Sequence, residues 1–335
     1  MAEKNETKSL KKRKGFDFNH WGYFFIAPFF IIFTIFSLIP LISTFTNSLF
    51  ENYRDGLQQI GPRFVGFANF IAVFKSDILR YIGNTFIIWM AGFIPQIAIS
   101  LLLSVWFTSS ELKIKAQQFF KTVIYMPNLI MASAFAMLFF TIFSDNGPAN
   151  SILMKIGFAE ERIRFLSSQA WTRGLVATMN FLMWYGNTTI LLMAGIMSID
   201  DSIFEAAKID GANPFQIFAR ITMPMLMPIF IYVLITSLIG GIQMFDVPQI
   251  LTNGEGNPNR TSMTLIMYLN KHLTNKNYGM AGAVSVITFA ITSVFSFSIY
   301  SMTMKKYQNM TGGHTHTHSK PKAKAQIKES TGGAK

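Results

Sequence analysis

The sequence predicts an all-α integral membrane protein with six transmembrane helices. Half of its 335 residues are hydrophobic and only 14% are charged. Six segments contain no charged residue, and each exceeds the ~20 residues that a helix needs to cross a bilayer. They are residues 21–50, 81–110, 122–144, 174–199, 221–245 and 278–304. None of them alternates polar and apolar residues, as the strands of a membrane barrel would.

The two ends of the chain are polar and basic. Residues 1–20 include the block Lys11-Lys12-Arg13-Lys14 and offer little apolar surface to bury, so we expect a disordered tail. Residues 305–335 form a second polar tail that contains three histidines. These are His314, His316 and His318. They have no acidic partner nearby, which favours a solvated tail over a metal site. Between the tails, residues 21–304 are expected to form one membrane domain.

Charge and cysteine content exclude several classes of protein. The formal net charge of +12 lies largely in the two tails, beside apolar segments. Attraction to a membrane surface explains this distribution better than nucleic-acid binding, for which no recognition motif is present. The chain contains no cysteine, which excludes disulfides and Cys-based metal sites. The first apolar segment is too long for a signal-peptide core and lacks a small-residue cleavage site, so we interpret it as a retained span.

The distribution of Lys and Arg predicts the orientation. With the N-terminus inside, 18 of the 29 Lys and Arg residues fall in the inner segments, mainly in the tails. This bias favours both termini on the cytoplasmic side. Three longer segments then lie outside, at residues 51–80, 145–173 and 249–277. The middle one contains a short helical pattern at 149–156.

Residues 200–228, between the fourth and fifth apolar segments, have the pattern of a helix, a turn and a second helix. Ser202 followed by Glu205 predicts a capping box at the first helix. Gly211 provides the permissive backbone where that helix ends. Asn213 can cap the second helix, with Pro214 at its first position. The apolar residues of the second helix then recur at a spacing of three, at Phe215, Phe218 and Ile221.

This stretch resembles the EAA signature of ABC-importer permeases. That signature reads EAA, three residues, Gly, nine residues, Ile, any residue, Leu, Pro. The matching residues are Glu205, Ala206, Ala207, Gly211, Ile221 and Pro224. Met223 stands where Leu is usual, a change that conserves volume. Asp210 and Phe218 resemble the carbohydrate-uptake branch of the family. The resemblance implies that residues 200–223 form the cytoplasmic coupling hairpin, which docks on the ATPase subunit; an ordinary amphipathic hairpin at the inner surface is the alternative.

The resemblance to sugar permeases covers residues 20–305. It includes the first span, the FVGFANF stretch, Asn84-Thr85 and the MFDVPQILT stretch, and the start of the chain is similar to the F-type half of maltose-permease pairs. The family implies a bacterial plasma-membrane complex with a second, similar permease, two ATP-binding subunits and an extracellular sugar-binding protein. ATP and Mg would lie on the ATPases and no cofactor on this chain. The outer loops would receive the binding protein or pack as lids.

The residues themselves favour transport over catalysis. No GxxxxGK[ST] phosphate loop occurs, so this chain is not expected to hydrolyse ATP. No nucleophile motif or zinc-ligand spacing appears, which argues against a membrane enzyme. A secondary transporter without an ATPase partner is the alternative function. It would usually carry ionisable residues within its spans, and these six spans have none.

A polar face of the fourth span is the candidate substrate path. Asn180, Trp184 and Asn187 fall at i, i+4 and i+7, on one side of a helix. Amides can bind sugar hydroxyl groups and an aromatic ring can cover a sugar's apolar face. At 1.5 Å per residue from the start of the span, Trp184 lies roughly 15 Å deep. Gln243 could add a polar group, and Asp246 could bind a hydroxyl or cap a helix. Packing between helices is the alternative role for these amides.

Overall fold

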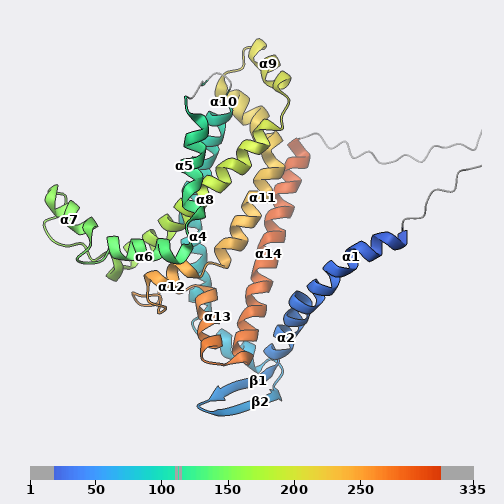
Figure 1. The fold of residues 1–335 in the computed structure, drawn as a ribbon, viewed down its shortest axis with the longest axis vertical. Coiled ribbons are helices and arrows are strands. Elements are labelled where there is room, and N and C mark those ends of the chain that lie inside the picture. The colour runs from blue at the N-terminus through green and yellow to red at the C-terminus, as the bar shows by residue number, and fades with distance from the viewer. Residues whose placement is uncertain (1–18, 110–111, 113–114, 311–335) are drawn as a thin grey trace, which may run out of the picture. The chain divides into compact units, whose positions relative to one another are not determined.

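The computed structural model describes residues 19–109, 112 and 115–310, and about three quarters of them are helical (Figure 1). The basic tail up to residue 18 and the polar tail from residue 311, with its three histidines, lie outside the described residues. The final helix continues to Met310, beyond the expected end of the membrane domain at 304. By internal packing the chain divides into two units. One contains the residues up to Ser76 together with Leu269–Ile287, and the other contains Asp77–Tyr268 and the residues from Thr288.

The first unit combines helices with a short sheet. Its elements are α1 (Asn19–Phe33), a π-helical turn (Thr34–Leu38), α2 (Ile39–Ser48), β1 (Phe50–Asp55), β2 (Gln58–Phe64), α3 (Ala68–Lys75) and the first part of α14 (Tyr278–Met310). The apolar side chains of α1 are exposed, as expected of a helix that lipid covers. The start of α14 lies close to β1, because a Cβ on Gly279 would sit 2.4 Å from the Phe50 carbonyl oxygen.

The antiparallel hairpin of β1 and β2 is a small sheet, not anticipated from the sequence, within the mostly helical fold that was predicted. Phe50 stands opposite Phe64, with ring centroids 5.5 Å apart, and Arg63 pairs with Glu51 at 2.6 Å. The strands are joined directly after Asp55 by Gly56, which has a positive φ of 58°. An Asp-Gly dipeptide between strand-forming residues is a strong hairpin signal, and the prediction passed over it.

The described residues of the second unit form helices joined by loops and include no strand. Its elements are α4 (Ile78–Thr108), α5 (Gln117–Leu129), α6 (Ala132–Ile142), α7 (Pro148–Lys155), a 3-10 turn (Phe165–Ser167), α8 (Gln169–Met197), α9 (Asp201–Ile209), α10 (Pro214–Ile217), a π-helical turn (Phe218–Thr222), α11 (Met223–Ile242) and α12 (Asp246–Leu251). Helix α13 (Leu265–Thr274) begins in this unit, in a segment that was expected to be a loop. The helix expected at 149–156 is confirmed by α7.

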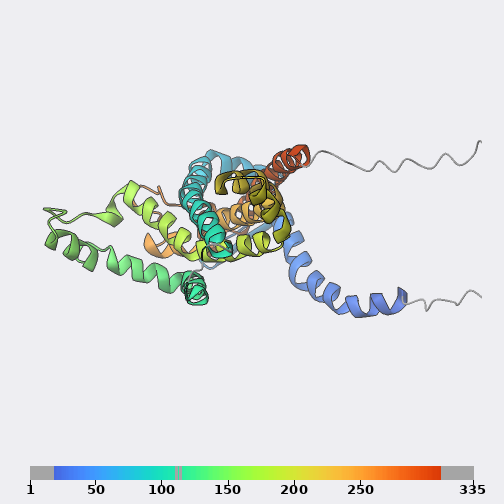
Figure 2. The same ribbon diagram turned by 90° about the horizontal axis from the view of Figure 1, so that it is seen from above.

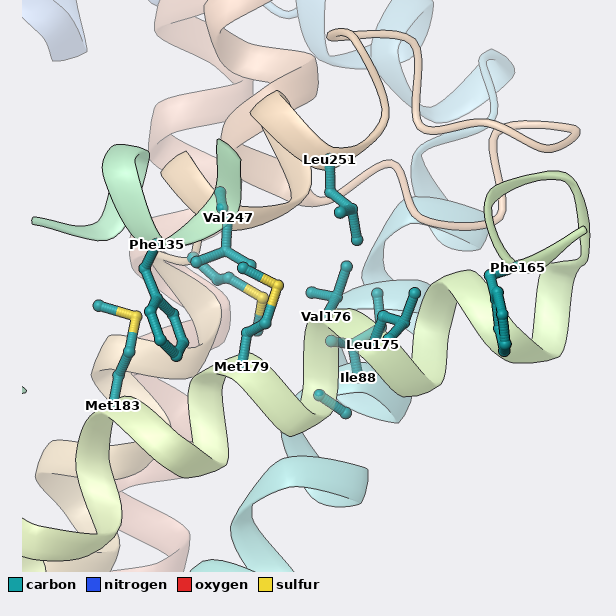
Figure 3. Packing of buried hydrophobic residues seen from close by; sticks show 12 residues of the cluster. Ile88, Phe135, Phe165, Leu175, Val176, Met179, Met183, Val247 and Leu251 are labelled. Atoms are coloured by element: carbon teal, nitrogen blue, oxygen red, sulfur yellow. The ribbon is translucent and has the colours of Figure 1, made fainter. Parts of the chain in front are cut away.

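Helix α8 is the centre of the second unit. It packs against α4, α5 and α11. Both ribbon views show α6 and α7 extending sideways from these helices (Figures 1 and 2). Buried side chains from α4, α6, α8 and α12 converge beside α8 (Figure 3). The labelled residues of this cluster are Ile88, Phe135, Phe165, Leu175, Val176, Met179, Met183, Val247 and Leu251.

The spans depart from the six that were expected. Four helical stretches are long and apolar enough to cross a membrane, and they begin at Trp21, Ile78, Pro214 and Tyr278. The third expected span is two helices, α5 and α6, bent by 90° at their junction. The fourth, α8, is one helix of 29 residues, but its amides and hydroxyls lower its hydropathy. The described residues therefore give four spans, or five if the bent pair counts as one.

Close helix contacts occur at glycines on both sides of α8. A Cβ on Gly92 of α4 would lie 2.8 Å from the carbonyl oxygen of Ala177 in α8. A Cβ on Gly186 of α8 would lie 2.1 Å from the carbonyl oxygen of Ile124 in α5. Small residues allow backbones to approach in this way, and in a membrane such packing is a main source of helix association.

This packing predicts opposite effects for two glycines of the same helix. Gly186→Ala should lower stability by about 1–3 kcal/mol, because the methyl group must push α5 away. Gly174→Ala is the control, since its Cβ would meet open space and alanine favours a helix. Denaturant unfolding of the purified protein, followed by tryptophan fluorescence, measures both variants. Equal stability of the two would show that the α5–α8 contact is not tight.

Candidate functional site

A cavity of about 260 Å³ lies among α4, α8 and α11. Each helix contributes one large aromatic ring to its wall: Trp89 from α4, Trp184 from α8 and Tyr232 from α11. Trp184 and Tyr232 are more than one-third exposed, so their rings remain accessible. The cavity therefore offers apolar ring faces from three directions.

Uncharged polar groups complete the wall. They are Gln96, Asn180, Asn187, Thr188, Thr236 and Ser237. Gln96 is buried and donates a hydrogen bond of 2.8 Å from Nε2 to Thr188 Oγ1, which joins α4 to α8. Asn180 donates from Nδ2 to the carbonyl oxygen of Val176 at 2.9 Å. These two bonds use the N–H groups of the amides and fix the orientation of both side chains.

The position of Trp89 depends on a glycine in α11. Its indole Nε1 donates to Ser237 Oγ at 3.2 Å, and its ring stacks on Phe93 with centroids 5.3 Å apart. A Cβ on Gly241 would lie only 2.1 Å from the indole ring. The absence of a side chain at Gly241 is therefore what allows α11 to close against Trp89.

The structure brings together three of the five residues expected on the substrate path. Asn180, Trp184 and Asn187 all line the cavity, as their helical spacing predicted. Gln243 and Asp246 are exposed and are not among its lining residues. Asp246 is instead the first residue of α12, where a carboxylate interacts favourably with the helix dipole.

The cavity residues of α4 and α11 were not predicted from the sequence. Trp89 and Gln96 are seven residues apart on α4, and Tyr232, Thr236 and Gly240 follow at spacings of four on α11. These are the same helical spacings that revealed the α8 residues. Helical spacing could thus have identified the polar faces of the second and fifth spans. That these faces meet in one cavity depends on how the helices pack, which spacing does not predict.

The wall suits binding of a neutral polar molecule. None of the described residues that line the cavity is Asp, Glu, Lys or Arg. Amides and hydroxyls both donate and accept hydrogen bonds, and aromatic rings cover apolar C–H faces. These groups can hold a solute that has hydroxyls and apolar faces, and they include no nucleophile paired with a base.

The helix–turn–helix at 200–223 is confirmed, but its first cap differs from the prediction. Asp200, not Ser202, caps α9: its carboxylate accepts a 2.9 Å hydrogen bond from the Ser202 backbone N–H. Hydrogen bonds from the Ser202 hydroxyl and backbone lower the pKa of Asp200. The backbone of Asp200 is extended, with ψ at 128°, so the helix starts too early for Ser202 to be its cap. Glu205 is left exposed.

The turn and the second cap are as expected. Gly211 has a positive φ of 78°, and its N–H donates to the Lys208 carbonyl while the Ala212 N–H donates to the Ala207 carbonyl at 2.9 Å. This pair of bonds is the Schellman motif that ends a helix. Asn213 and Gln216 form a capping box, with bonds of 2.8 and 2.9 Å in the two directions.

The hairpin presents an exposed surface. Glu205, Ala206, Asp210 and Gly211 are exposed, Ala207 is buried, and Ile221 and Pro224 are half-buried. Two apolar side chains stand out, because Ile209 is 86% exposed and Phe215 is 76% exposed. Apolar residues exposed beside polar ones are typical of a surface that contacts a partner.

The hairpin connects the two helices that supply most of the cavity wall. Helix α8 leads into α9 through Ser198–Asp200, and α10 continues into α11 through the π-helical turn Phe218–Thr222. Extra residues in such turns occur often at functional sites. The hairpin is therefore joined in the chain to both helices.

Comparison with known proteins yields a family match over residues 65–306, to the model described as binding-protein-dependent transport system inner membrane component. The lactose transport system permease protein LacF of Rhizobium radiobacter is 30% identical over 295 residues, covering 87% of this chain and 96% of that protein. The arabinooligosaccharides transport system permease protein AraP of Bacillus subtilis (strain 168) is 31% identical over 283 residues, covering 83% and 87% of the two chains.

Two solved structures share the fold. One is the crystal structure of a bacterial ABC transporter involved in the import of the acidic polysaccharide alginate, with a TM-score of 0.71, 24% identity and coverage of 86% of this chain and 96% of that one. The other is the bacterial alginate ABC transporter in complex with an alginate pentasaccharide-bound periplasmic protein. Its TM-score is 0.74 at 23% identity, with coverage of 89% and 99%.

Proposed function

The chain belongs to the family of binding-protein-dependent transport system inner membrane components, and we propose that it is the permease subunit of an ATP-driven importer that translocates a sugar. It is a multi-pass plasma-membrane protein and a transport subunit, not an enzyme. The observation that carries the proposal is the connection of an exposed EAA hairpin to the two helices that line the cavity.

A carbohydrate is the substrate class that the cavity and the relatives support. The relatives are permeases of systems named for lactose and arabinooligosaccharides. The cavity wall combines three aromatic rings with amides and hydroxyls, which matches a sugar's ring faces and hydroxyl groups. None of the described residues that line it is Asp, Glu, Lys, Arg or His, the usual groups of ion coupling, which favours ATP-driven import over secondary transport.

Partners complete the importer. A second, similar permease would pair with this chain, two ATPases would bind ATP and Mg, and an extracellular binding protein would deliver the sugar. Family membership supports each of these, and the wording of the family description names binding-protein dependence. The exposed Ile209 and Phe215 support docking of the hairpin in an ATPase groove. The proposed coupling residues are Glu205, Ala206, Ala207, Asp210, Gly211, Ile221 and Pro224.

In the proposed transport cycle, α8 and α11 move as stiff helices attached to the hairpin. Closure of the ATPases on ATP would pull the hairpin, and α8 and α11 would tilt with it. Tyr232 lies ten residues beyond the π-helical turn, about 15 Å along the helix, so a small tilt shifts the aromatic wall of the cavity. Binding of sugar and ATP would in this way select between outward and inward access.

The proposed orientation places both tails, 1–20 and 305–335, and the hairpin in the cytoplasm. A single cysteine is easily introduced, because the natural chain has none. With Ser319→Cys, a membrane-impermeant maleimide should label permeabilised cells and leave intact cells unlabelled. Labelling of intact cells would place the C-terminus outside and rule out this topology.

Gly211→Val should uncouple transport. A Cβ at Gly211 meets open space, so the cost of valine arises from its positive φ alone. We expect the ATPase to be lost when the complex is purified through this chain, and uptake to be lost with it. Gly211→Asn is the matched control, because asparagine tolerates this conformation. Normal recovery of the ATPase with Gly211→Val and intact uptake would contradict the coupling role.

Trp184→Ala should weaken sugar binding by about tenfold, the factor expected when one ring contact worth about 1–1.5 kcal/mol is removed. Trp106→Ala is the control, since Trp106 is similarly exposed and does not line the cavity. Direct binding of radiolabelled sugar to the purified complex, without the binding protein, measures both. Unchanged affinity, or failure of the complex to assemble, would indicate that Trp184 serves helix packing.

A further inference from the structure

A second pocket, of about 450 Å³, lies at the end of α11 that is opposite to the hairpin. Its walls come from α6, the 3-10 turn before α8, the end of α12 and the loop that follows α12. Its polar side chains include three asparagines, Asn253, Asn257 and Asn259, together with Ser167. Phe140 and Leu166 are among the apolar residues on its wall. All of these residues belong to the second unit.

The loop holds a conformation that is costly in isolation. Asn253, Asn259 and Arg260 have positive φ values of 51°, 51° and 56°. Residues held in such sparsely populated conformations cluster at functional sites, because the surrounding structure must stabilise them. Here the loop continues into Thr261–Leu265, which is fully buried.

Side chains from α4 and α8 hold the backbone of this loop by hydrogen bonds. Arg173 of α8 donates from Nε to the Thr261 carbonyl at 2.8 Å and from an Nη to Asn84 Oδ1 at 2.5 Å. Asn84 of α4 donates in turn to the carbonyls of Arg260, at 2.9 Å, and Met263, at 3.1 Å. Hydrogen bonds from a charged or buried donor are the stronger ones, so the pocket wall is rigid.

The asparagine side chains that line the pocket make no hydrogen bond to another described residue. The structure records no side-chain hydrogen bond for Asn253, Asn257 or Asn259 among the described residues, and all three are exposed. The preference of asparagine for a positive φ explains the residue type at two of these positions. It does not explain Asn257, whose φ is not positive.

We propose that this pocket is a second carbohydrate site, where a neutral sugar binds before it enters the cavity. The inference rests on the proposed function, which places this end of the helices outside. Three free amides provide donors and acceptors for hydroxyl groups, and Phe140 provides a ring face beside them. None of the described residues that line the pocket is charged, so the site fits neutral sugars. Its rigidity reduces the ordering cost of binding a weakly held ligand.

The test uses the complete importer in lipid nanodiscs, without its binding protein. Lactose, maltotriose and arabinotriose serve as neutral probes at millimolar concentration, and proton saturation-transfer NMR reports their contact with the protein. The double variant Trp184→Ala/Asn187→Ala removes the cavity site, so the remaining signal reports the second pocket. Asn253→Gly and Asn259→Gly remove two amides while keeping the positive φ accessible, and Asn257→Ala removes the third.

We expect the remaining signal to fall about tenfold in the triple asparagine variant, the factor for losing one or two hydrogen bonds. Asn275→Gly, an exposed asparagine outside the pocket, should leave the signal unchanged. If the triple variant does not assemble, Asn257→Ala alone gives the same comparison, with a smaller loss expected.

Two results would overturn the second site. One is an unchanged signal after removal of the three amides in an importer whose ATPase responds to sugar once the binding protein is added. The other is an unchanged sugar signal combined with lost capture of the sugar-free binding protein, which would assign the pocket to protein docking. A natural complex that shows no saturation transfer and, with its binding protein added, no sugar-stimulated ATP hydrolysis with any probe would overturn transport of these sugars itself.

Discussion

Close contact between helix backbones is the constraint on which this structure depends. Lipid is as apolar as the side chains, so helices in a membrane are held together by packing and hydrogen bonds. Helix α8 meets α5 at Gly186, α4 at the Gly92–Ala177 contact, and α11 at Gly195. With three neighbours this close, α8 can contain amides and hydroxyls and still be a stable interior helix. The polar wall of the cavity is a consequence of this packing.

The same contacts explain how one element can control another. A tightly packed interface has discrete arrangements and resists gradual deformation. Helices α8 and α11 enter the hairpin from both sides, through Ser198–Asp200 and the π-helical turn Phe218–Thr222. In the proposed cycle, a force on the hairpin reaches the cavity through α11 directly and through α8 by way of Ser198–Asp200. Gly241, which admits Trp89 against α11, lies in the cavity wall that such a movement would reach.

Turns and helix caps were predicted correctly where they depend only on neighbouring residues in the chain. Gly211 and Asn213 fulfil their expected roles, because a turn and a cap depend on adjacent residues. Ser202 was wrong as a cap, since Asp200 lies two residues earlier and offers a charged acceptor. The α8 face was found by helical spacing, whereas Gln243 and Asp246 do not line the cavity and Tyr232 was not considered. Only the packing of three helices decides which polar positions share a cavity.

Two larger features were also beyond the sequence reasoning. Hydropathy alone cannot separate a lipid-facing helix from a surrounded one, and α8 carries amides and hydroxyls while packing against α4, α5 and α11. The break between α5 and α6 likewise interrupts a run that contains no charge. In the first unit, the hairpin at Asp55-Gly56 had a usable signal, which the search for long apolar runs obscured.

ATP hydrolysis by the reconstituted importer is the decisive measurement. The complete complex is placed in liposomes with its binding protein, and hydrolysis and uptake are followed together for lactose, maltotriose and arabinotriose. Sugar transport driven by the hairpin predicts that one or more of these sugars raises hydrolysis and uptake in parallel, and that a non-hydrolysable ATP analogue stops uptake. Uptake that continues with the analogue and follows an ion gradient instead would contradict it.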